Sequence, residues 1–130
     1  MQINDPNVVA EIEATLARYE KALVDRDVET LGDCFWNDPR VVRFGTHENL
    51  YGHAEIQAFR QSVKPGGHAK QSVLRTVITT FGKDFACVSI AFAARRGGTG
   101  RQQQSWVRMP EGWKVVAAHV SYMPETPASS

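Results

Sequence analysis

The stretch KQSVLRTVITTFGKDFACVSIAFAARRGGTGRQQQSWVRMPEGWKVVAAHVSY, residues 70–122, decides the fold. Its apolar residues largely alternate with polar ones, which is the pattern of half-buried β-strands. Short Gly-rich segments at residues 82–84, 97–100 and 110–112 interrupt the pattern. Links of this length favour antiparallel hairpins. We therefore expect four consecutive antiparallel strands, at residues 70–81, 85–95, 101–109 and 113–122.

The chain before this stretch has the 3.6-residue period of helices. Asp5 is a good N-cap and Pro6 suits the first helical position, so a first helix should run to about Arg26. Its buried stripe contains Val8, Ile12, Leu16, Tyr19 and Leu23, and Arg18, Glu20 and Lys21 point elsewhere. We expect two shorter helices at residues 28–36 and 53–63, and a short strand at 40–44 followed by a loop at 46–52.

Helices followed by hairpin-linked strands are typical of an α+β fold. The three helices are the only cover for one face of the sheet, so we predict a cone: a curved antiparallel sheet closed by helices around a pocket. We expect one domain at residues 1–123 and a flexible Pro/Ser-rich tail at residues 124–130. If Cys87, Ser89 and Ala91 face inward, Val88, Ile90 and Phe92 form an apolar outer face that favours a dimer.

The composition excludes several kinds of partner. A net charge of +1 gives no bulk attraction to nucleic acid or to an anionic membrane. No apolar stretch has the length of a membrane span and the N-terminus has no apolar signal core, so we expect a cytoplasmic protein.

Cys34 and Cys87 are interpreted as reduced core thiols. The four histidines lack the spacing of metal ligands, so we expect neither metal nor organic cofactor.

Two residues stand out as candidates for catalysis. Arg43 lies within an apolar strand, where a guanidinium keeps its charge and needs either an internal carboxylate, with Glu48 and Glu55 nearest in sequence, or an anionic ligand. The alternative is an arginine on the exposed face of that strand. Tyr19 lies in the middle of the buried helical stripe. It is either a core aromatic residue or a phenol that donates a proton in the pocket.

Four further residues are candidates for substrate binding. Arg60 borders the inner face of the third helix, four residues after Ile56. The alternative is that its guanidinium reaches water, as is usual for arginines on helix borders. Gln104 offers a donor and an acceptor if it faces inward, and otherwise faces solvent or a dimer partner. His119 and Ser121 share a face of the last strand and would project together into a cavity. The alternative for His119 is a structural histidine with satisfied hydrogen bonds.

Seven sequence blocks in fixed order resemble the AtzH-like family, which also includes the oxalurate catabolism proteins called HpxZ. The blocks are YEKALV (19–24), FWNDP (35–39), VRFG (42–45), ENLYG (48–52), IQAFR (56–60), QSWV (104–107) and GWKVVAAHVS (112–121). The similarity extends from about Asn4 to Tyr122. The order and spacing of the seven blocks make it far more specific than any single motif in this chain.

The resemblance implies a nuclear transport factor 2-like, SnoaL-like cone and a homodimer. It also implies cofactor-independent decarboxylation of a small anionic urea-derived substrate, 1,3-dicarboxyurea to allophanate in cyanuric acid breakdown. In that family a tyrosine on the first helix and an arginine on the first strand carry the active site, and they match Tyr19 and Arg43. The oxalurate branch leaves a second possibility, a binding or accessory protein without catalysis. An isomerase or dehydratase ranks below both, with His119 as its only candidate base.

Overall fold

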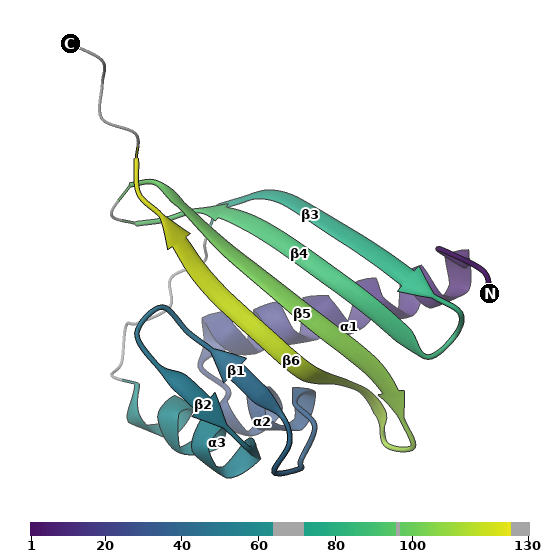
Figure 1. The fold of residues 1–130 in the computed structure, drawn as a ribbon, viewed down its shortest axis with the longest axis horizontal. Helices are drawn as coiled ribbons and strands as arrows, with labels where there is room; N and C mark the ends of the chain where they lie inside the picture. The colour runs from purple at the N-terminus through teal and green to yellow at the C-terminus, as the bar shows by residue number, and fades with distance from the viewer. Residues whose placement is uncertain (64–71, 96, 126–130) are drawn as a thin grey trace.

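In the part of the chain that the computed structural model describes, residues 1–63, 72–95 and 97–125, a curved six-stranded sheet is covered on one face by three helices (Figure 1). The helices are α1 (Pro6–Asp25), α2 (Val28–Cys34) and α3 (His53–Ser62). Across the sheet the strands are β2 (Asn49–Tyr51), β1 (Val42–Phe44), β6 (Gly112–Met123), β5 (Thr99–Met109), β4 (Phe85–Ala93) and β3 (Ser72–Phe81). The α+β class is confirmed.

Helix α1 begins and ends as its sequence predicts. The carboxylate of Asp5 accepts a hydrogen bond from the backbone N–H of Asn7 at 3.0 Å, and Pro6 occupies the first turn. Arg26 ends the helix in the left-handed conformation with φ 56°. Because these caps fix both ends, the apolar stripe of α1 faces the sheet along its whole length. Its buried residues are Val8, Ile12, Leu16, Tyr19 and Ala22.

Helix α2 is shorter than the sequence suggests. It starts after Asp27, as expected, but ends at Cys34 because Phe35 is already extended. Phe35 forms an isolated parallel bridge with Val115 of β6, and the N–H of Trp36 donates to the Val115 carbonyl at 2.9 Å. Pairing with the sheet therefore replaces the last helical turn and places Phe35 in the interior.

The hairpins that join β3 to β6 are confirmed, with antiparallel pairing throughout. One pairing departs from the expected antiparallel sheet, because β1 pairs in parallel with β6. The expected loop at residues 46–52 contains the edge strand β2, which pairs antiparallel with β1. The sequence does not reveal β2 because its three residues are too few to show the alternation of apolar and polar residues that marks a strand. Residues 70–71 of the first expected strand and 126–130 of the expected tail lie outside the described residues.

The inner face of β4 is the apolar one. Val88 and Ile90 are buried against the helices, and Cys87 and Ser89 face the opposite side of the sheet. The outer face of β4 is therefore not the apolar surface from which a dimer was expected. The same orientation leaves Cys87 partly exposed rather than in the core, whereas Cys34 is buried. Burial is the main reason that the pKa of the Cys34 thiol is raised.

Candidate functional site

Arg43 lies on the inner face of the sheet, enclosed rather than exposed to solvent. Its partner in the parallel pairing is the buried Ala118 of β6. The Arg43 side chain is 12 % exposed, and its Nη1 donates to Oε1 of Glu48 at 3.2 Å. The guanidinium carbon lies 5.5 Å from the ring centre of Phe59. Its Nε is buried and has no hydrogen-bond partner among the described residues.

Arg60, on α3, is the second interior cation. It is 7 % exposed, and its guanidinium carbon lies 5.0 Å from the ring centre of Phe35 and 5.9 Å from that of Tyr19. Nε and Nη2 of Arg60 are buried without a hydrogen-bond partner in the described chain, where no carboxylate pairs with this side chain either. A buried guanidinium in this state is costly unless an anion compensates it. Arg60 thus has free donors inside the protein.

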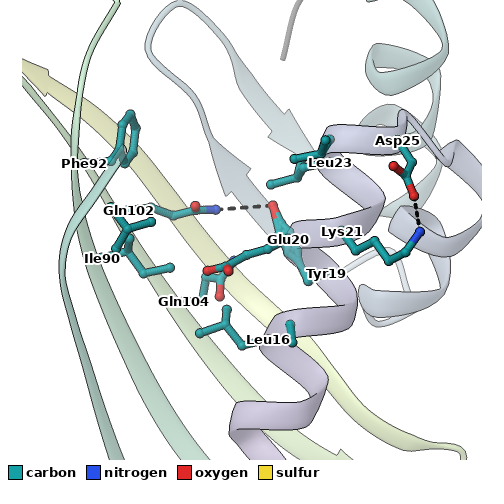
Figure 2. Close-up of a pocket in the computed structure, with 13 residues that line it drawn as sticks. Leu16, Tyr19, Glu20, Lys21, Leu23, Asp25, Ile90, Phe92, Gln102 and Gln104 are labelled. Atoms are coloured by element: carbon teal, nitrogen blue, oxygen red, sulfur yellow. Dashed lines mark hydrogen bonds and ion pairs between the residues drawn. The ribbon is translucent and has the colours of Figure 1, made fainter. Parts of the chain in front are cut away.

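Tyr19 is 2 % exposed, at the centre of the interior. Its ring packs edge-on against Phe35 at 6.1 Å and against Trp106 at 6.5 Å between ring centres. The phenol oxygen accepts a hydrogen bond from Nε2 of Gln102 at 3.3 Å (Figure 2). Since the oxygen acts as the acceptor in this contact, the phenol hydrogen remains available for a third group.

Gln104 also faces inward and is 2 % exposed. Its Oε1 accepts a hydrogen bond from the indole N–H of Trp106 at 3.0 Å, and its Nε2 is buried without a partner in the described chain. The contact of Gln102 with Tyr19 was not anticipated. The alternation of Gln102, Gln104 and Trp106 along β5 is the signal that places all three on one face.

Two cavities lie between the helices and the sheet. One, of about 390 Å³, separates α1 from β3, β4 and β5 and is lined by Tyr19 and Gln104 (Figure 2). The other, of about 560 Å³, is lined by Arg43 and Arg60. Leu23 lines both cavities, and Arg60 lies over the ring of Tyr19. The two cavities therefore adjoin, with the phenol lining the first and the two guanidiniums lining the second.

His119 and Ser121 do not join this region: they share a face, as expected, but line a separate cavity on the other side of the sheet. The β5–β6 register shifts between Ser105 and Trp106, so that Ser105 pairs with Ala117 and Trp106 with Val115. This bulge reverses the alternation along β6. Ala118 then faces inward, and His119 packs edge-on against Phe44 on the other side of the sheet. The Ser121 hydroxyl accepts from Nε of the exposed Arg101 at 3.2 Å.

Glu20 is the acidic residue that the sequence analysis missed. It was expected to point away from the core, yet it lines the same cavity as Tyr19 and is half-buried. Burial raises the pKa of its carboxyl group. The available signal is its position four residues after Leu16, which places both side chains on one side of α1.

Metal-binding clusters and membrane-spanning helices are both absent from the described residues. No group of three or more His, Cys, Asp or Glu side chains there is arranged to hold a metal ion. None of the helices described is both long and apolar enough to traverse a bilayer.

The fold of the chain is nuclear transport factor 2-like. A protein of this class from Pseudomonas putida KT2440, of unknown function, has a TM-score of 0.75 at 17 % identity over 93 % of this chain and 90 % of its own. More specifically, the chain belongs to the AtzH-like family, whose sequence profile matches residues 1–126.

Two solved structures are much more similar in sequence. A protein of unknown function from the DUF3225 family of Pectobacterium atrosepticum SCRI1043 is 48 % identical, over 93 % of this chain and 94 % of its own, with a TM-score of 0.89. A cystatin-like fold protein from Burkholderia xenovorans LB400 is 42 % identical, over 97 % and 99 %, with a TM-score of 0.90. No curated protein matches the chain.

Proposed function

We propose that the protein is a cofactor-independent decarboxylase of a small N-carboxylated urea, converting 1,3-dicarboxyurea to allophanate. The observation that carries the proposal is the excess of positive charge inside the fold. Arg43 and Arg60 are enclosed in a cavity that adjoins the one lined by Tyr19, and Glu48 is the one carboxylate paired with either of them in the described chain. A substrate with two carboxylates supplies the missing negative charge. Membership of the AtzH-like family supports this reaction.

The reaction breaks the bond between a urea nitrogen and its carboxyl carbon. Carbon dioxide leaves, the electron pair of the bond stays on the nitrogen, and the nitrogen takes up a proton. Conjugation spreads the developing negative charge from the nitrogen onto the urea oxygen, so no cofactor is needed as an electron sink. The protein must therefore hold the substrate, stabilise charge at the urea oxygen and supply one proton.

The interior side chains divide these tasks. Arg43 anchors the carboxylate that is retained, through its unpaired Nε and the adjacent N–H groups. Arg60 donates to the urea oxygen, where a fixed donor in a water-poor site is most effective. Gln104 provides a further buried N–H donor. Tyr19 donates its free phenol hydrogen to the nitrogen as carbon dioxide leaves. His119 and Ser121, on the outer face, take no part.

The direct test is release of carbon dioxide from freshly prepared 1,3-dicarboxyurea by the purified protein. We expect a saturable rate at least about 10²-fold above the uncatalysed reaction, the contribution typical of one well-placed proton donor. Oxalurate, which has no N-carboxylate, should bind but not react. A rate equal to the background, with retained binding of either acid by calorimetry, would instead indicate a binding or accessory protein.

Arg60→Met tests whether Arg60 serves the ligand rather than the fold. We expect an unchanged or higher melting temperature, because methionine fills the space without a buried, uncompensated charge. We also expect at least about tenfold weaker substrate binding, since hydrogen bonds to charged groups are worth about 1.5–3 kcal/mol. Melting curves and KM measure the two effects.

The exposed Arg40 provides the control, because Arg40→Met should leave KM unchanged. A large loss of stability in Arg60→Met would assign it a structural role.

We also propose that the protein is a homodimer, on the strength of the family resemblance. Light scattering in solution should then give twice the 14.5 kDa mass of one chain. A monomeric mass at the concentrations used for the assay would remove the dimer from the proposal and leave the interior site unchanged.

A further inference from the structure

The side chain of Glu20 is placed beside the reacting groups without serving the fold. It follows Tyr19 on α1, lines the same cavity and extends towards the sheet near Gln104 (Figure 2). No hydrogen bond or ion pair joins Glu20 to any residue that the structure describes. A half-buried carboxyl group with no partner does not stabilise the fold, so its position calls for another explanation.

The groups that face Glu20 favour its uncharged form. Leu16 of α1 and Ile90 of β4 give the cavity an apolar wall. The other charged lining residues are Lys21 and Asp25 of α1, and they pair with each other. The described lining residues from the sheet carry no charge and are Val73 of β3, Ile90 and Phe92 of β4, and Gln102 and Gln104 of β5. Burial is the cause of the raised pKa of Glu20.

We propose that Glu20 supplies the proton that the decarboxylation consumes, passing it to Tyr19 through the cavity between α1 and the sheet. The inference rests on the proposed function and extends it. A phenol that has given its proton to the substrate nitrogen must be reprotonated before the next turnover. A protonated carboxyl group in the same cavity is suited to that task.

The proton balance of one turnover is then complete. As the nitrogen–carbon bond breaks and carbon dioxide leaves, the proton of the Tyr19 hydroxyl moves to the nitrogen. The carboxyl proton of Glu20 moves to the phenolate, through water, for which a cavity of about 390 Å³ has room. The Glu20 carboxylate finally takes a proton from bulk solvent, which its partly exposed position allows. One proton is consumed for each carbon dioxide released.

The first measurement is the pH dependence of carbon dioxide release by Glu20→Gln. We expect kcat to fall by about 10²-fold or more, with KM changed less than threefold. In the wild type the protonated acid is the active form, so kcat should fall as pH rises through the pKa of Glu20. This fall of kcat with rising pH should be absent in Glu20→Gln and retained in Glu20→Asp. Glu13→Gln, at an exposed site on the same helix, should match the wild type.

The second measurement is the melting temperature as a function of pH, which needs no substrate. A carboxyl group with a raised pKa in the folded state costs stability once pH exceeds its unfolded pKa, near the ordinary value of 4.5. Glu20→Gln should therefore melt higher than the wild type at pH 7–8, and the difference should vanish below about pH 4.5. Glu13→Gln should show no such pH-dependent difference.

The outcomes separate the two proposals. A wild type that releases carbon dioxide, together with a Glu20→Gln variant of unchanged kcat and unchanged pH profile, overturns the role of Glu20 and leaves the decarboxylase intact. A wild type with no rate above background overturns both. An equal melting temperature of the two proteins across the whole pH range also overturns the inference, because Glu20 would then not be desolvated.

Discussion

Arg43→Ala should abolish saturable turnover of 1,3-dicarboxyurea at accessible substrate concentrations. Truncating one partner of a buried, hydrogen-bonded charge pair costs about 2–5 kcal/mol, so KM should rise by about hundredfold or more. The loss is aggravated by Glu48, whose carboxylate loses its contact with Arg43 and remains beside the cavity as a negative charge that repels the substrate. Initial rates over a wide substrate range, with calorimetric binding of oxalurate, measure the effect.

Two further variants test how Arg43 binds the substrate. One changes the shape of its side chain, and the other removes its internal partner. Arg43→Lys keeps the charge but loses the planar set of donors, so it should recover only part of the affinity. Glu48→Gln removes the internal partner and should leave substrate binding equal or tighter, because the full charge of Arg43 then faces the ligand. Melting curves check that each variant is folded. An Arg43→Ala protein that is folded and has an unchanged KM would contradict the assigned anchor.

Tyr19→Phe should lose turnover while keeping the fold and most of the binding. Removing a positioned proton donor lowers kcat by about 10²–10⁴-fold, and KM should change less than threefold. The ring contacts with Phe35 and Trp106 survive the substitution. Only the hydrogen bond from Gln102 is lost, which costs about 1 kcal/mol of stability. Single-turnover rates and thermal melts measure the two quantities.

Gln102→Met is the matched control for this experiment. It removes the same hydrogen bond but leaves the phenol of Tyr19 in place. If the phenol supplies the proton, Gln102→Met should retain most of the turnover that Tyr19→Phe loses. Equal losses in the two variants would show that the hydrogen bond, rather than the proton, is what matters. Retained turnover in Tyr19→Phe would remove the tyrosine from the chemistry.

The sequence predicts the fold well where structure is set by neighbouring residues. The N-terminal cap of α1 depends on Asp5 and Pro6, its buried face on a 3.6-residue period, and the β3–β6 hairpins on short Gly-rich links. Arg43 was identified for the same local reason, since a guanidinium within an apolar strand needs a partner. The interior placement of Arg60 was likewise suggested by its spacing to Ile56.

The remaining features depend on contacts between distant parts of the chain. A bulge beside Trp106 decides which side of β6 faces inward, and no residue type marks it in advance. His119 lies on the outer side of the sheet for that reason. The approach of Gln102 to Tyr19 depends on how a helix crosses a strand more than eighty residues later. Glu20 was misplaced because a charged residue was assumed to seek water, whereas the stripe of α1 is wide enough to turn it towards the sheet.

The parallel pairing of β1 with β6 also constrains the order in which the molecule folds. Arg43 acquires its neighbour Ala118 only when the last strand joins the sheet, long after α1, α2 and α3 have left the ribosome. Until then the guanidinium stays hydrated, because the wall that encloses it has not yet formed. Enclosure of this cation by β6 is therefore a late event in folding.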